Sequence, residues 1–155
     1  KKGMLTYEVE QVILAIVVTT GIASIFLTKD CTPDYNSGLA HAVFYAMTAY
    51  PVIEERHLHG EVVGFGVLLA LLADQQEEAF EDIYRLNKAI HLPTSLEEIE
   101  ITREQWEECM TRIPHMSDVA HYPYPVTEDM LKAAMERLEE RNKKVLQTLS
   151  ASCSL

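Results

Sequence analysis

Apolar residues recur along most of the chain at the three- and four-residue spacing of an amphipathic helix. The segment His59–Ala73 is apolar on nearly all sides, which is typical of a helix in the middle of a core. Gly38–Tyr50 is small and apolar and ends before a proline. Further apolar faces mark helices over Phe80–Ile90, Trp106–Ile113 and Leu131–Leu149. The pattern predicts an all-α bundle of about six to eight helices, forming a single domain over residues 1–155.

The N-terminal part is harder to assign from its pattern. Val12–Leu27 is an apolar run of about 16 residues, below the roughly 20 needed to span a bilayer, and it contains Thr19, Thr20 and Ser24. We expect a buried core helix here rather than a membrane span, although its β-branched residues would also suit a strand. A polar loop follows over Lys29–Ser37.

Local signals mark helix starts and close contacts. Ser95–Glu98 and Thr102–Gln105 have the form of capping boxes. Gly60, Gly64 and Gly66 each cost roughly 1 kcal/mol against alanine inside a helix. We therefore expect these glycines to allow another backbone or a ligand to approach closely.

Charge and cysteine content narrow the function classes. The net charge is −11 over 155 residues, which disfavours binding to nucleic acids or anionic membranes. The three cysteines, Cys31, Cys109 and Cys153, form no CxxC pair, so a cysteine zinc site is excluded and a reducing, cytoplasmic setting is expected. The sequence has no GxGxxG and no alternation of strands and helices, so it contains no nucleotide-binding sheet.

Two histidines stand in the most apolar part of the chain. His41 lies among small and aliphatic residues, and His59 opens the apolar segment 59–73. A buried imidazole needs a partner, which is either a hydrogen-bonding group or a metal ion such as zinc. On residue chemistry alone both interpretations stay open. If the histidines are metal ligands, their imidazoles should face one another across two neighbouring helices.

Four segments, in order, resemble the iron- or zinc-dependent alcohol dehydrogenases, the family that includes glycerol dehydrogenase. Gly38–Ala49 looks like the helix that carries one zinc-binding histidine, and His59–Gly66 looks like an HGE-x-V-x-FG segment that carries a second. Leu86–Thr94 resembles a stretch ending in G-L-P-x-T, with His91 where glycine is usual. Ala120–Thr127 is similar to an I-H-N-x-P-F-P-V-T segment.

The resemblance implies a specific role for the chain. It would be the helical C-terminal domain of a dehydroquinate synthase-like, iron-containing alcohol dehydrogenase fold, without the N-terminal α/β domain that binds NAD. His41 and His59 would be metal ligands for zinc, with iron as an alternative. The family's third ligand, an aspartate in a G-D-A-like segment, has no counterpart in this sequence. The substrate would be a small polyol, the assembly a homo-oligomer, and the missing partner the nucleotide-binding domain.

The function implied by the resemblance is that of an NAD-dependent glycerol dehydrogenase, and two alternatives remain beside it. A free-standing or degenerate helical module without catalysis would have the same helical pattern. An enzyme of the glycerol-1-phosphate dehydrogenase type would need cationic phosphate contacts, and no basic cluster surrounds His41 or His59 in the sequence. The chain alone is expected to be inactive, because it lacks a recognisable NAD site.

Overall fold

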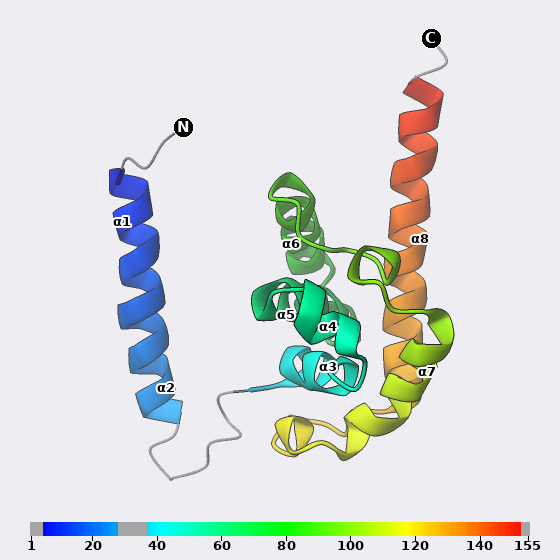
Figure 1. Ribbon diagram of the computed structural model, residues 1–155, viewed down its shortest axis with the longest axis horizontal. Helices are drawn as coiled ribbons and strands as arrows, with labels where there is room; N and C mark the ends of the chain where they lie inside the picture. The colour runs from blue at the N-terminus through cyan, green and yellow to red at the C-terminus, as the bar shows by residue number, and fades with distance from the viewer. Residues whose placement is uncertain (1–4, 28–36, 153–155) are drawn as a thin grey trace. The chain divides into compact units, whose positions relative to one another are not determined.

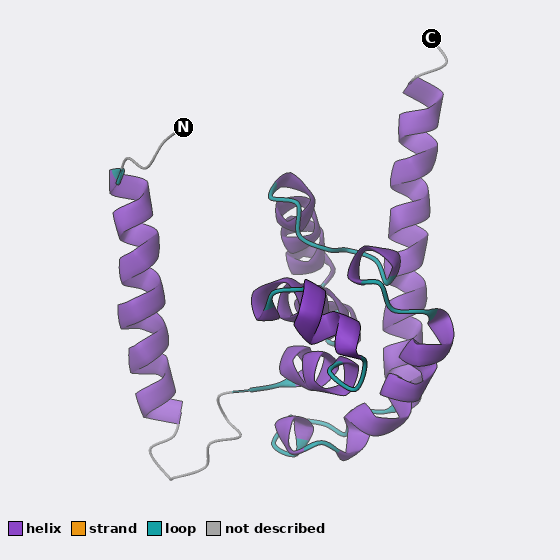
Figure 2. Ribbon diagram, viewed as in Figure 1, coloured by secondary structure: helices purple, strands orange, loops and turns teal. Residues whose placement is uncertain are grey.

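The computed structural model describes residues 5–27 and 37–152, and the side chains of residues 5–26 and 37–147. These residues form helices, turns and loops and no strand, as Figure 2 shows. The predicted all-α class is therefore confirmed. Contacts between Cα atoms divide the chain into two compact units, Lys1–Asn36 and Ser37–Leu155, and each is described by itself. The assignment of residues 1–155 to one domain stays a prediction, and the predicted loop Lys29–Ser37 lies almost entirely outside the described residues.

The first unit contains one continuous helix. A π-helical stretch, Ala15–Thr20, joins α1 (Tyr7–Leu14) to α2 (Gly21–Leu27). The helix begins at Thr6, whose hydroxyl accepts a hydrogen bond of 3.4 Å from the amide of Val9. The sequence therefore predicted a helix correctly in this region.

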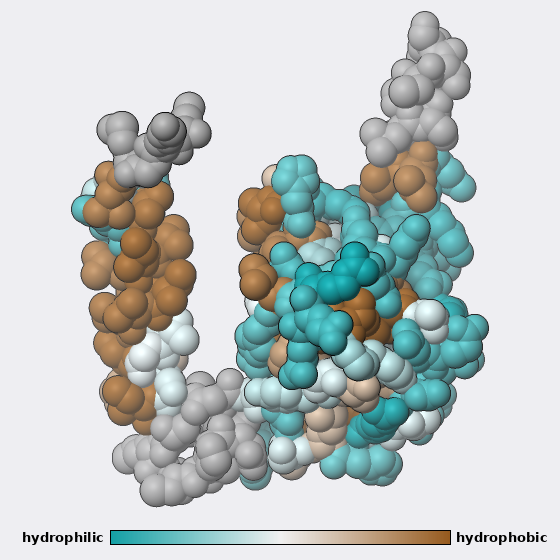
Figure 3. Space-filling model, in the orientation of Figure 1, coloured by the Kyte–Doolittle hydropathy of each residue, from teal (hydrophilic) through white to brown (hydrophobic). Residues whose placement is uncertain are grey.

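The expectation that this helix is buried is wrong. None of its residues between 7 and 26 is buried, and Figure 3 shows a mostly hydrophobic surface over it. Its 20 residues Tyr7–Phe26 are long and apolar enough to cross a membrane, by length and composition. A helix that is apolar on every side belongs either in the core of a large protein or in lipid. The hydrophobic pattern therefore predicts the helix, but it does not predict whether protein or lipid surrounds it.

The second unit is organised around α5 (His59–Ala73). This helix packs against α3 (Leu39–Met47), α6 (Glu77–Ala89) and α8 (Glu128–Ser152), whose arrangement Figure 1 shows. Six of its residues are buried, so the predicted central core helix is confirmed. The core residues around it include Leu39, Val43, Met47, Phe65, Leu68, Leu69, Tyr84, Trp106, Ile113, Leu131 and Leu138.

Shorter elements complete the second unit. Helix α7 (Arg103–Arg112) packs against α3 and α8, and the 3₁₀ turns Glu97–Ile99, Ile113–His115 and Ser117–Val119 connect the longer helices. Helix α4 (Pro51–Arg56) was not predicted, because it is only six residues long and buries only Ile53.

Of the three glycines of α5, only Gly66 is required by a backbone contact. A Cβ atom at Gly66 would lie 2.5 Å from the carbonyl oxygen of Ala40 and 2.9 Å from its Cα atom. At Gly64 it would meet Leu92 at 3.4 Å, an ordinary contact, and at Gly60 it would meet nothing within 4 Å. The predicted close approach is confirmed at Gly66, where α3 and α5 touch through their main chains.

The two predicted capping boxes have different outcomes. At Thr102 the box is complete, because the hydroxyl accepts from the Gln105 amide at 3.3 Å and the Gln105 side chain accepts from the Thr102 amide at 2.8 Å. At Ser95 only one half forms, since the Glu98 amide donates to the hydroxyl at 3.2 Å. The Glu98 carboxylate instead accepts from the Thr94 amide at 2.6 Å, and a short 3₁₀ turn replaces the α-helix.

Candidate functional site

Both predicted metal ligands stand at helix starts. His41 lies in the first turn of α3, which begins after the extended residue Gly38. His59 is the first residue of α5, where the amide of Leu58 donates a hydrogen bond of 2.9 Å to the Glu61 carboxylate. This contact fixes the first turn of α5 and with it the position of His59.

The close contact between α3 and α5 brings the two imidazoles together. Their ring centroids are 5.6 Å apart, with an angle of 44° between the ring planes. The Phe44 ring packs edge-on against His59 with centroids 4.4 Å apart, and the Tyr45 centroid lies 6.4 Å from that of His41. The two rings therefore lie as the sequence predicted, side by side on neighbouring helices.

Burial shapes the electrostatics of the pair. It lowers the pKa of His41, the neighbouring His59 lowers it further, and the carboxylate of Asp118 opposes both effects. A lowered pKa keeps His41 neutral over a wider pH range, and the neutral imidazole is the form that binds a metal ion. His59 is exposed, so the pair is open to solvent on the side of α5.

The distance between the two ring centroids, 5.6 Å, is in the range expected for two imidazoles on one ion. Two imidazoles on a tetrahedral zinc ion have centroids about 5–6 Å apart, because each Zn–N bond is about 2.0–2.1 Å long. However, no group of three His, Cys, Asp or Glu side chains in the described part of the chain is placed to hold a metal. Metal binding by His41 and His59 therefore stays a prediction.

The other histidines and the buried cysteine belong to no group of three side chains that could hold a metal in the described part of the chain. His115 and His121 are exposed on the segment that follows α7. His91 is also exposed and has a φ angle of 62°, in the left-handed region that favours glycine. This angle explains why glycine is usual at the corresponding place in the family pattern. Burial raises the pKa of the Cys109 thiol to about 11, so it is a core residue and not a nucleophile.

His57 is a partly buried, charged neighbour of His59 that the sequence did not single out. Its side chain is only 10% exposed and lies between two carboxylates, with Nδ1 3.8 Å from Glu61 and Nε2 3.4 Å from Glu100. Neither contact has hydrogen-bond geometry, and Nε2 has no hydrogen-bond partner among the described residues. Arg56 pairs with the same Glu100 at 2.7 Å. The mixed charges around His57 indicate a structural cluster joining α4, α5 and the Glu97–Ile99 turn.

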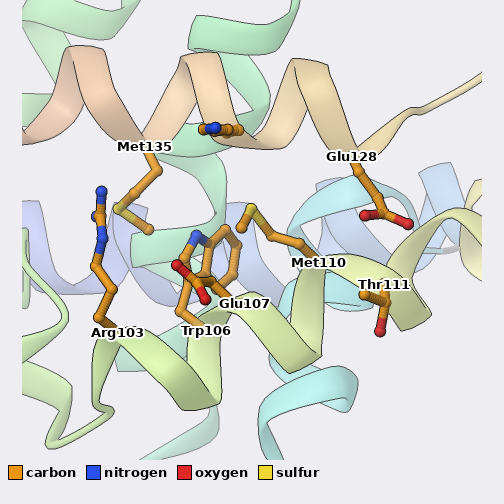
Figure 4. A pocket seen from close by; sticks show the side chains of 8 residues that line it. Arg103, Trp106, Glu107, Met110, Thr111, Glu128 and Met135 are labelled. Carbon is orange, nitrogen blue, oxygen red and sulfur yellow. The ribbon is translucent and has the colours of Figure 1, made fainter.

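A separate cavity of about 230 Å³ lies between α7 and α8. Figure 4 shows the Trp106 ring between Met110 and Met135 at its floor. The indole N–H of Trp106 is buried without a partner in the described structure. The lining residues are Arg103, Trp106, Glu107, Met110, Thr111, Glu128, Lys132 and Met135. None of them belongs to the histidine pair, so this cavity is not part of the candidate metal site.

Comparison with known proteins relates this chain to two dehydrogenases. Hydroxycarboxylate dehydrogenase A of Escherichia coli K12 is 30% identical over 104 residues, which cover 64% of this chain and 28% of that protein. Glycerol dehydrogenase of Thermotoga maritima is 35% identical over 95 residues, covering 57% of this chain and 25% of that protein. The chain is related to dehydrogenases. No family model matches the chain.

Each match covers only a small part of the relative. The chain spans about a quarter of the length of the curated relatives that it matches. The relation therefore supports a general oxidoreductase assignment.

Proposed function

We propose that the chain is the helical, metal- and substrate-binding domain of an NAD-dependent polyol dehydrogenase of the iron- and zinc-dependent type. The observation that carries this proposal is the 5.6 Å separation of the His41 and His59 rings at the adjoining starts of α3 and α5. The relation to a glycerol dehydrogenase supports it independently.

The residues at the starts of α3 and α5 would form one side of the reaction site. His41 and His59 would hold a divalent ion, which acidifies a substrate hydroxyl when bound. Phe44 packs edge-on against His59, and the side chains of Leu58 and Tyr45 are exposed apolar surface on the same two helix starts. This surface would exclude water from the carbon that loses hydride, while the open side of His59 admits the substrate.

The remaining parts of the reaction belong to a nucleotide-binding domain outside this sequence. NAD would bind there, and hydride would pass from the polyol carbon to the nicotinamide. In this proposal residues 1–155 act as a C-terminal helical domain within a homo-oligomer. Apolar residues of the exposed helix 7–27 would be covered in that assembly, because apolar surface of this extent is otherwise unfavourable in water.

A hydroxycarboxylate is the second candidate substrate, because one relative is a hydroxycarboxylate dehydrogenase. Binding a carboxylate group favours a cationic partner such as arginine. The described arginine nearest in sequence to the pair, Arg56, is already paired with Glu100. A polyol, which needs no such cation, therefore agrees better with the surroundings of His41 and His59.

A chimera tests the proposal. The matched 95-residue part of the Thermotoga maritima glycerol dehydrogenase would be replaced by the corresponding residues of this chain, and NADH formation measured with glycerol and with a hydroxycarboxylate. We expect the chimera to oxidise glycerol, and we expect this activity to be retained in His115→Ala, since the His115 side chain is exposed. In His41→Ala the loss should exceed the roughly 10–100-fold effect of removing a partner that supports a metal ligand. A folded, NAD-binding chimera whose activity is unchanged by His41→Ala would contradict the proposal, and preference for the hydroxycarboxylate would replace the polyol assignment.

A further inference from the structure

The cavity between α7 and α8 has an apolar floor and charged side chains around it. Its floor is the ring of Trp106, which is 1% exposed and lies between the side chains of Met110 and Met135 (Figure 4). The exposed charged residues that line the cavity are two bases and two acids, Arg103, Lys132, Glu107 and Glu128. Their formal charges cancel, so the lining gives no net attraction to an anion or to a cation. The cavity therefore favours an uncharged, apolar compound.

The indole N–H of Trp106 is a hydrogen-bond donor at this apolar floor. It is buried and has no acceptor among the described residues. Figure 4 shows the ring nitrogen on the edge that is turned toward α8, the helix that carries Met135. A buried donor without an acceptor is unfavourable, so an oxygen atom of a bound compound would stabilise it. The unbranched side chains of Met110 and Met135 are flexible enough to let such an oxygen reach the N–H.

The volume of the cavity limits the size of such a compound. The cavity measures about 230 Å³, and an apolar cavity of about 150 Å³ is large enough to hold benzene. One aromatic ring with a short substituent therefore fits. Methionine sulfur atoms and the indole ring also make favourable contacts with aromatic rings.

We propose that this cavity binds an uncharged compound of one aromatic ring with a carbonyl or hydroxyl oxygen, which accepts a hydrogen bond from the Trp106 indole. None of the lining residues belongs to the His41–His59 pair, so the proposal does not rest on the proposed function. The compound would be a second ligand of the helical domain and not the substrate at the histidine pair.

The test uses the full 155-residue chain and two probes of matched shape, acetophenone and α-methylstyrene. Acetophenone has a carbonyl oxygen, and α-methylstyrene has a methylene group in its place. Trp106 is the only tryptophan, so its indole N–H gives a single signal in a ¹H–¹⁵N NMR spectrum, and titrations followed by NMR give the affinities. Trp106→Phe removes the donor. Tyr50→Phe is the matched control, because the Tyr50 hydroxyl donates to Glu108 at 2.7 Å and neither residue lines the cavity.

We expect acetophenone to move the indole signal downfield and to bind about 2- to 10-fold more tightly than α-methylstyrene, which is the effect of one hydrogen bond. This preference should persist in Tyr50→Phe and disappear in Trp106→Phe, with urea unfolding verifying that each variant is folded. Nuclear Overhauser effects should join the probe's ring protons to the methyl groups of Met110 and Met135. Equal affinities for the two probes in the parent chain, or acetophenone binding that leaves the indole signal in place, would overturn the proposal. If Trp106→Phe does not fold, the comparison of the two probes on the parent chain still decides.

Discussion

Replacing Gly66 by alanine perturbs the contact that sets the spacing of α3 and α5. The added Cβ atom would lie 2.5, 2.9 and 3.1 Å from the carbonyl oxygen, Cα and carbonyl carbon of Ala40. All three are backbone atoms, so no side chain can rotate away to relieve the overlap. An ordinary contact begins at 3.4 Å, so the two helices must separate locally by nearly 1 Å.

Two opposing effects determine the size of the change. Alanine is favoured over glycine by about 1 kcal/mol in a helix interior, whereas inserting a methyl group into a packed interface costs about 1–3 kcal/mol. Because the overlap at Gly66 is with main chain, we place the cost at the upper end of that range. The net expectation is a loss of about 1–2 kcal/mol in the free energy of unfolding.

Urea unfolding monitored by tryptophan fluorescence measures this loss directly. Trp106 is the only tryptophan in the chain and is 1% exposed, so its emission reports on the folded second unit. Gly60→Ala, in the same helix with open space around the new Cβ, is the matched control and should be neutral or stabilising by up to about 1 kcal/mol. Equal urea midpoints for Gly66→Ala and Gly60→Ala would refute the close contact between the helices.

Three further predictions follow from other parts of the structure. His91→Gly should raise the free energy of unfolding by about 0.5 kcal/mol, and the urea midpoint with it. Glycine relieves the left-handed conformation at φ 62°, at some cost in chain entropy. A lower midpoint would argue against that conformation. Glu81 accepts two hydrogen bonds from Arg141, at 2.7 and 3.0 Å, and these bonds lower its pKa. Because both groups are partly exposed, Glu81→Gln should cost only about 0.5–1 kcal/mol near neutral pH. This contribution is present above the carboxyl's ordinary pKa and should disappear as the pH falls through its lowered value, so parent and variant stabilities should converge in acid; a constant difference would contradict the ion pair. Finally, the purified chain with glycerol and NAD should give no NADH, whereas turnover that His59→Ala abolishes would show that the chain is a complete enzyme.

Much of the second unit could be predicted from hydrophobic spacing. His59–Ala73 is apolar all round and occupies the centre, since only a position surrounded by other helices satisfies such a surface. The same argument failed for the helix that begins at Tyr7, which is also long and apolar but has no buried residue between 7 and 26. An apolar helix must be shielded from water, but its sequence does not show whether the same chain, another chain or lipid shields it.

The candidate site was predictable only in part. The sequence singled out His41 and His59, and the rings do lie together. It gave no indication that His57, two residues before His59, is more buried than His59, because that depends on where α5 begins. The start of α5 is fixed by the hydrogen bond between the Leu58 amide and Glu61, which is a local contact that periodicity does not reveal. The position of Asp118 beside α3 likewise depends on tertiary packing between segments far apart in the sequence.

X-ray absorption at the zinc edge tests the central claim, that His41 and His59 share a metal ion. The full chain would be loaded with one equivalent of zinc and compared with His41→Ala and His59→Ala. The account predicts scattering from two imidazoles with Zn–N distances of about 2.0–2.1 Å in the parent, and the loss of one imidazole in each variant. A zinc environment without imidazole in the parent chain, or one that neither substitution changes, would contradict it.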